Sequence, residues 1–222
     1  MKNYVYLFHS EDLRSMIFGT LILAVIVAVI STILGTLGAI GAFYSSKKLK
    51  RPIHLMNQIP VVNADVVTGF SICVLLIVFF KMDKASYIPL VIGLVSLCSP
   101  FVYLSVIPRL KQMDPQLYEA ALDLGCSSFG ALRKVVLPQL TSGIVSGFMM
   151  SITLTLDDYF ITTYTKPSMF DTISTYVVNA TKGAQTDVKT ALWALSTIIF
   201  LIVIFVVIGM NHTGRKENDH EI

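Results

Sequence analysis

Long apolar runs separated by short polar segments dominate this 222-residue chain. A helix that crosses a hydrocarbon core of about 30 Å needs roughly 20 predominantly apolar residues. Four runs are long enough: residues 16–44, 87–107, 135–156 and 190–209. A further, interrupted run covers residues 53–80. The pattern therefore predicts an all-α, polytopic membrane protein with five transmembrane helices.

Composition agrees with this pattern. Hydrophobic residues make up 54% of the chain, charged residues only 14%, and the mean hydropathy is +0.71, which is more apolar than a soluble domain of this length. The first apolar run is far longer than the core of a signal peptide and has no small-residue cleavage site nearby, so we expect it to stay in the membrane. We expect a single transmembrane domain over residues 1–210, followed by a cytoplasmic tail at 211–222.

The basic residues predict the orientation. One set follows the first run, flanks the loop at about 109–138, and follows the last run: Lys47, Lys48, Lys50, Arg51, Arg109, Lys111, Arg133, Lys134, Arg215 and Lys216. The basic residues of the other loops are sparser and are mixed with acids. Because loops rich in Lys and Arg stay in the cytoplasm, the N-terminus is expected outside and the C-terminus inside. The loop at about 109–138 is then cytoplasmic.

A short helix is expected within that loop. Asp114 suits an N-cap, and Pro115 suits the first helical position because it has no amide to lose. The helix should continue over residues 116–124 and end at Gly125, which readily adopts a left-handed backbone. Ser127 or Ser128 then caps a second helix. A surface helix of this length, with Glu119 beside two alanines, is a plausible knob for a partner's groove.

Seven residues of the loop have a characteristic spacing, an acid and small residues first and apolar residues after them: Glu119, Ala120, Ala121, Gly125, Val135, Leu137 and Pro138. This spacing resembles the EAA motif of ABC-importer permeases, with Val135 where that family usually has Ile. The resemblance implies the type I importer (MetI-like) permease fold, with a cytoplasmic coupling helix that docks on an ATPase. It assigns ATPase coupling to Glu119, Ala120, Ala121 and Gly125.

The interrupted run at 53–80 is the first candidate for a substrate path. Pro60 is expected to break it, and Asn63 and Asp65 follow between apolar flanks. Broken helices at membrane depth are tolerated where they line a cavity or pack inside protein. At about 1.5 Å per residue from Arg51, Asp65 is expected roughly 20 Å in, near the membrane midplane.

Asp157 and Asp158 end the fourth run and raise the same question. A carboxylate at a helix centre costs about 2.5–3.5 kcal/mol on insertion scales, so such an acid usually faces a cavity or a counterion. Adjacent residues of a helix differ in direction by about 100°, so only one acid is expected to point into a path. The other is expected to cap a following turn or to pair with a Lys. Carboxylates together with the aromatic face of Tyr159 suit a polycation as cargo.

The segment at residues 154–163, Leu-Thr-Leu-Asp-Asp-Tyr-Phe-Ile-Thr-Thr, also resembles the segment after the EAA loop in spermidine/putrescine ABC-importer permeases. The position of Asp65 also resembles that subfamily, which usually has an acid there after a Pro, although Ala64 replaces the Pro in this chain. The resemblance extends over about residues 3–209 and follows the second permease subunit of polyamine importers. Such subunits generally have six spans, so a first helix is expected to be missing here, through truncation or as a five-span variant.

The resemblance implies several partners: two cytoplasmic ATPase subunits, a second permease subunit, an external polyamine-binding protein and membrane lipid. The chain has no Gly-rich loop ending in Lys-Ser/Thr, so ATP hydrolysis is expected in a partner chain. The four His residues do not cluster, and Cys73, Cys98 and Cys126 have no metal-ligand spacing, so neither a metal nor a cofactor is expected. Nothing points to nucleic acid.

Two alternatives remain open. One is an ABC permease for another small solute. The other is a channel subunit or a membrane enzyme, although the chain lacks a constellation of nucleophile, base and metal ligands. Removal of Glu119 would discriminate, because an importer would lose assembly or coupling whereas a channel or an enzyme would keep its activity.

Overall fold

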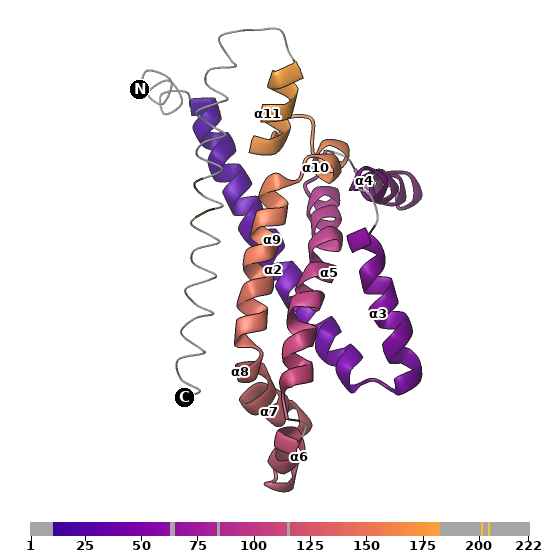
Figure 1. The fold of residues 1–222 in the computed structure, drawn as a ribbon. Helices are drawn as coiled ribbons and strands as arrows, with labels where there is room; N and C mark the ends of the chain where they lie inside the picture. Colours follow the sequence, from indigo (N-terminus) through magenta and orange to yellow (C-terminus); the bar gives the residue numbers. More distant parts are fainter. Residues whose placement is uncertain are drawn as a thin grey trace.

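The structure, a computed structural model, describes residues 11–62, 65–83, 85–114 and 116–182, together with Leu201 and Ile204. Every regular element in these ranges is helical (Figure 1). They are α2 (Glu11–Tyr44), α3 (Lys47–Val62), α4 (Asp65–Cys73), the π-helix η1 (Val74–Phe79), α5 (Ile88–Gln112), α6 (Gln116–Asp123), α7 (Ser128–Ala131), the π-helix η2 (Leu132–Val136), α8 (Leu137–Gln139), α9 (Thr141–Asp157), α10 (Phe160–Thr165) and α11 (Ile173–Lys182). The all-α prediction is confirmed for this part of the chain.

Helices α2, α5 and α9 pack against one another and form the core of the bundle. The fully buried side chain of Val102 on α5 lies between a glycine of each neighbour. A Cβ added to Gly35 of α2 would come 2.6 Å from the Val102 Cβ, and one added to Gly147 of α9 would come 3.0 Å from its Cγ1. A Cβ added to Gly143 of α9 would likewise come 3.1 Å from the Ser105 carbonyl oxygen of α5. The glycines thus allow close helix packing, as small residues do inside membranes.

Among the described residues, α2 and α5 are long and apolar enough to span a membrane, and the pair 128–139 and 141–157 counts as a third span if it is taken together. That pair is bent by 70°. The prediction of one continuous span over 135–156 is therefore wrong at its start, because the chain bends and α9 begins only at Thr141. Pro138 cannot donate an amide hydrogen bond, and the Thr141 hydroxyl donates to the Pro138 carbonyl where the chain turns.

The interrupted second run also differs from the prediction. Helix α3 continues through Pro60 to Val62, so Pro60 does not end it. The break comes after Val62, and α4 then turns away from the axis of α3 (Figure 1). The depth of Asp65 cannot be counted along one straight helix. The run at 190–209 and the tail at 211–222 lie outside the described residues, apart from Leu201 and Ile204.

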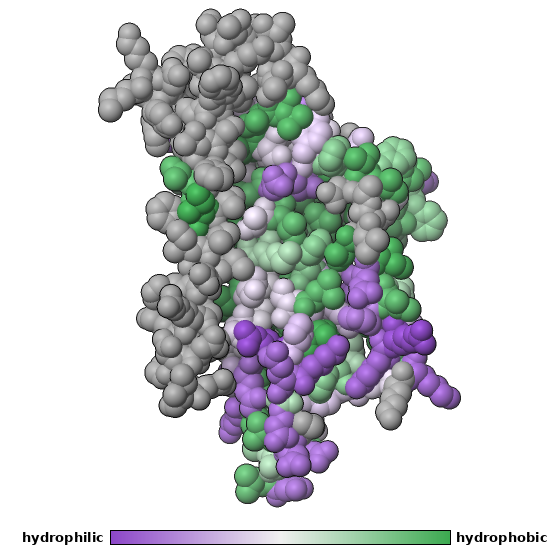
Figure 2. Space-filling view, viewed as in Figure 1, coloured by the Kyte–Doolittle hydropathy of each residue, from purple (hydrophilic) through white to green (hydrophobic). Residues whose placement is uncertain are grey.

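The surface separates apolar from charged regions. Hydrophilic side chains gather at the end that carries α6 and α7, whereas apolar side chains cover much of the region around α4 (Figure 2). One face of α2 exposes large apolar side chains along its length: Phe18, Ile22, Val25, Ile26, Val29, Ile30, Ile33, Leu34 and Leu37. Such a face is expected of a helix surrounded by lipid or by another membrane chain.

Candidate coupling helix and cation path

The predicted loop helix is present as α6, and its ends are built as expected. The Asp114 Oδ1 accepts a hydrogen bond from the Gln116 amide at 2.9 Å. Gly125 has a φ of +83° and follows the last turn, as the left-handed residue that ends a helix. The Ser127 side chain accepts from the Gly130 amide at 3.2 Å and caps α7. Local sequence alone therefore fixes the start and end of this helix.

One side of this loop is free to meet a partner. Glu119 and Ala120 are exposed, whereas Ala121 is buried against the bundle. Two large apolar side chains of the same loop are strongly exposed: Leu124 is 86% exposed and Phe129 is 75% exposed. We call Glu119, Ala120, Leu124 and Phe129 the coupling face. Sequence reasoning missed Leu124 and Phe129, although apolar residues on both sides of Gly125 in a polar loop are a readable signal.

The coupling face is firmly attached to the membrane bundle. Buried side chains at the end of α5 and at the bend before α9 form one apolar cluster that includes Leu110, Met113, Val136 and Leu140. Tyr118 of α6 packs against this cluster. Side chains in such a cluster are close-packed, so a displacement of α6 acts directly on α5 and α9.

At the opposite end of the bundle, the two predicted acids have different environments. The Asp158 Oδ2 accepts hydrogen bonds from both the amide and the hydroxyl of Thr162, each at 2.8 Å. Asp158 thus caps the first turn of α10, the role predicted for one member of the pair. Asp157 is exposed, and its carbonyl accepts from the Ser174 hydroxyl at 3.1 Å. Tyr159 is partly buried, with its ring 5.3 Å from that of Phe160.

Helices α4 and α10 lie side by side in a parallel register. A Cβ on Gly69 would come 3.1 Å from the Ile161 amide nitrogen, and four residues further along α4 the Cys73 thiol donates to the Tyr164 carbonyl at 3.3 Å. Both helices therefore run in the same direction, with residues 69 and 73 of α4 beside residues 161 and 164 of α10. Sequence reasoning had no means of finding this meeting, because the two segments are about 90 residues apart.

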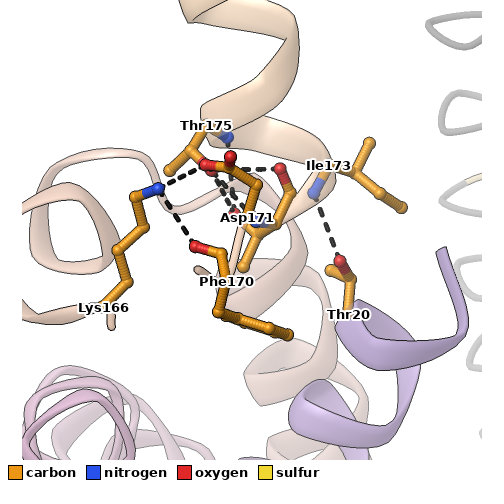
Figure 3. A network of polar contacts seen from close by, with 7 residues as sticks. Thr20, Lys166, Phe170, Asp171, Ile173 and Thr175 are labelled. Carbon is orange, nitrogen blue, oxygen red and sulfur yellow. Dashed lines mark hydrogen bonds and ion pairs between the residues drawn. The ribbon is translucent and has the colours of Figure 1, made fainter. Parts of the chain in front are cut away.

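The loop between α10 and α11 is held by a polar network (Figure 3). Lys166 forms an ion pair with Asp171, and its Nζ also donates to the Phe170 carbonyl at 3.0 Å. The Asp171 Oδ1 accepts from the Thr175 hydroxyl at 3.2 Å. The side chain of Lys166 is 15% exposed and that of Asp171 44%. The loop thus closes on itself over a few residues.

The same loop is tied to the first membrane helix. The Thr20 hydroxyl of α2 accepts a hydrogen bond from the Ile173 amide at 3.2 Å (Figure 3). The ring of Phe170 packs next to Gly19 and lies 5.3 Å from the ring of Tyr87, just before α5. The loop therefore covers the ends of α2 and α5 that lie away from the coupling face.

Metal-binding geometry is not found in the part of the chain that the structure describes, where no three His, Cys, Asp or Glu side chains are grouped for a metal ion. Cys73, Cys98 and Cys126 are free thiols. The chemistry offered by the described residues is therefore charge and hydrogen bonding at one end, and exposed apolar and acidic side chains at the other.

A family comparison defines the class of protein. Residues 35–213 match the family described as "Binding-protein-dependent transport system inner membrane component", and the chain belongs to this family. The predicted ABC-importer permease family is thereby confirmed, as is the prediction of a transporter subunit rather than an enzyme. The protein is an inner-membrane component.

Individual relatives are more specific. The chain is 27% identical over 218 residues to the spermidine/putrescine transport system permease protein PotC of Escherichia coli (strain K12), covering 97% of this chain and 80% of that protein. It is 27% identical over 215 residues to PotC of Haemophilus influenzae, covering 97% and 82%. The putrescine transport system permease protein PotI of Escherichia coli (strain K12) is 28% identical over 209 residues, covering 88% and 70%.

Solved structures agree on the fold. A bacterial ABC transporter involved in the import of the acidic polysaccharide alginate matches with a TM-score of 0.72 at 18% identity, covering 97% of this chain and 83% of that one. The MetNI methionine ABC transporter matches with a TM-score of 0.70 at 14% identity, covering 93% and 98%. The predicted MetI-like importer fold is confirmed.

Proposed function

We propose that this chain is a permease subunit of an ABC importer whose cargo is a polyamine, spermidine or putrescine. PotC and PotI, to which the chain is similar over most of its length, carry those cargoes in their names. The observation that carries the proposal is the parallel packing of α4 against α10, from which we infer, by extending the register one turn back, that the start of α4 at Asp65 lies near Asp158. Acids from two separate segments of the sequence thereby converge at the end of the bundle that lies away from the coupling face.

Such a site suits a polycation. Each ammonium group that leaves water needs acceptors to replace its hydration, and carboxylates supply both acceptors and charge. Asp157 is exposed and available to a cation, whereas Asp158 supplies charge while it also caps α10. The ring of Tyr159 adds cation–π attraction of about 0.5–2 kcal/mol, depending on how far it is desolvated.

The coupling face serves the ATPase. An exposed carboxylate at Glu119, a small residue at Ala120 and apolar side chains at Leu124 and Phe129 fit a groove with a basic edge and an apolar floor. Two ATPase subunits, a second permease and an external polyamine-binding protein complete the importer. In this arrangement the coupling face and the C-terminus are cytoplasmic, and the N-terminus and the polar network of Lys166 are outside.

The test is uptake of labelled spermidine and putrescine in a host deleted for the gene and complemented with variants. Asp158→Asn keeps an oxygen that accepts from Thr162 but removes the charge, so we expect normal membrane levels and at least tenfold slower uptake. Glu119→Ala should abolish uptake by weakening ATPase docking. Asp123→Asn is the matched control, because it neutralises an exposed acid of the same helix α6 and should leave uptake unchanged.

The other outcomes separate the alternatives. Unchanged polyamine uptake after deletion, in a host with no other polyamine importer, would leave an ABC permease for another small solute. Full activity of Glu119→Ala would exclude Glu119 from the ATPase contact.

A further inference from the structure

One buried side chain joins the two acid-bearing segments to the core of the bundle. Ile161 of α10 is fully buried, and it lies between Gly69 of α4 and Gly93 of α5. It belongs to the apolar cluster that also contains Leu90 and Leu94 of α5. Three helices therefore meet at this single side chain.

Both glycines are needed to admit it. A Cβ on Gly93 would come 2.8 Å from the Ile161 Cγ2, which is far inside an ordinary carbon contact of about 3.5–4.0 Å. A Cβ on Gly69 would come 3.1 Å from the Ile161 amide nitrogen and 3.2 Å from its Cγ1. Gly93 thus fits closely against the side chain of Ile161, and Gly69 fits closely against both its backbone and its side chain.

Helix α10 is short and is held in place by a few contacts. It is six residues long, and helices this short are not stable on their own. Its start is held by the Asp158 cap, and Thr165 at its other end is buried near Gly93. Ile161, together with the Asp158 cap and the Cys73–Tyr164 contact, therefore sets the register of α10 along α4.

We infer that Ile161 is a positioning residue for cation transport: seated between Gly69 and Gly93, it locks α10 to α4 on α5 and so fixes the spacing between their acid-bearing starts. This inference rests on the proposed function for the role of those acids. Electrostatic attraction falls with separation, and a misplacement of about 1 Å at a site that needs exact geometry can lower a rate by roughly 100-fold.

The experiment enlarges Gly93 and then shortens Ile161. Uptake is measured in the full importer complex, reconstituted into vesicles with its ATPase. Gly93→Ala should lower polyamine uptake by roughly tenfold, because the added methyl group pushes Ile161 away. Adding Ile161→Ala to Gly93→Ala makes room again and should return uptake to within about threefold of wild type. Ile161→Val alone keeps both γ carbons and should behave like wild type. Gly41→Ala is the control, because nothing lies within 4 Å of its added Cβ.

A second measurement reports the register without reference to cargo. Cys73 already lies against the Tyr164 carbonyl, so Tyr164→Cys creates a pair that should cross-link across α4 and α10. The cross-link should weaken in Gly93→Ala and return in Gly93→Ala/Ile161→Ala, and it should be absent when Cys73→Ser is added. Basal ATPase activity of each assembled variant should stay within twofold, which separates misplacement from failure to assemble.

The outcomes are distinct. Loss and recovery of the cross-link and of uptake together support the inference. The inference would be overturned if Gly93→Ala left the cross-link or the uptake unchanged. It would also be overturned if Gly93→Ala/Ile161→Ala restored the cross-link while uptake stayed low. A wild-type complex that imports no polyamine, yet shows the same cross-linking pattern, would refute the proposed cargo and not the packing.

Discussion

Replacement of Gly35 by Ala tests the packing of the bundle core. A Cβ at this position of α2 would lie 2.6 Å from the Val102 Cβ and 2.8 Å from the Ser99 carbonyl oxygen. Ordinary carbon contacts are about 3.5–4.0 Å, so the overlap is about 1 Å or more. Neither atom can rotate away, since one is backbone and the other is the stem of a β-branched side chain. Helices α2 and α5 must move apart to accept the methyl group.

The magnitude follows from two opposing terms. Overpacking of a close-packed site typically costs about 1–3 kcal/mol. Alanine in place of glycine within a helix returns about 0.5–1 kcal/mol of backbone entropy. Gly41, also on α2, has nothing within 4 Å of an added Cβ, so Gly41→Ala keeps only the favourable term. The two variants should therefore differ by about 1–3 kcal/mol, or by roughly 2–12 °C in thermal midpoint for a chain of this size.

The assay is the thermal midpoint of the detergent-solubilised complex, read as the fraction that stays monodisperse after heating. Gly35→Ala should fall below wild type while Gly41→Ala matches or exceeds it. Equal midpoints for both variants would refute the close approach of α2 and α5 at Val102. Val102→Ala in the Gly35→Ala background provides a check, because it vacates the space that the new methyl group needs and should recover part of the loss.

Three further predictions concern the two ends of the molecule. Asp114→Ala removes the acceptor for the Gln116 amide and should destabilise α6 by about 1 kcal/mol, seen as faster amide exchange over residues 116–123 with no change in α9; unchanged exchange would contradict the capping role. Lys166→Met breaks the ion pair with Asp171, but Asp171 is 44% exposed and water can replace the partner, so the loss in stability should be about 1 kcal/mol or less; a midpoint drop above about 5 °C would contradict this. Phe129→Ser removes a 75% exposed ring from the coupling face and should lower cargo-stimulated ATPase activity while leaving the thermal midpoint of the isolated permease unchanged; a variant that stays fully stimulated would exclude Phe129 from the docking surface.

The sequence predicts the coupling helix well because its determinants are local. An acid before a proline starts α6, a left-handed glycine ends it, and a serine starts the next helix, all within about a dozen residues. None of these signals needs a distant contact. The exposure of Glu119 and Ala120 follows from the same amphipathic pattern, whereas the burial of Ala121 depends on where the loop packs against the bundle.

The proposed cation path was less predictable because its geometry is not local. Pro60 was expected to break the second run, but α3 runs on to Val62 and a separate helix begins at Asp65. The bend before Thr141 was missed because residues 135–156 remain apolar on both sides of it. The meeting of α4 with α10 depends on glycine contacts between segments far apart in sequence. A single sequence shows these glycines, but it does not show what they face.

The packing of α5 limits how movement at one end can reach the other. Near its start, Gly93 contacts Ile161 and the acid-bearing helices. In its middle, Val102 is held between glycines of α2 and α9, and at its end Leu110 belongs to the cluster that anchors α6. Helices in contact at such short distances cannot slide past one another without separating first. Displacement of the coupling face should therefore move α2, α5 and α9 together, so we expect the path to open and close by motion of this unit against a second permease rather than by rearrangement within it.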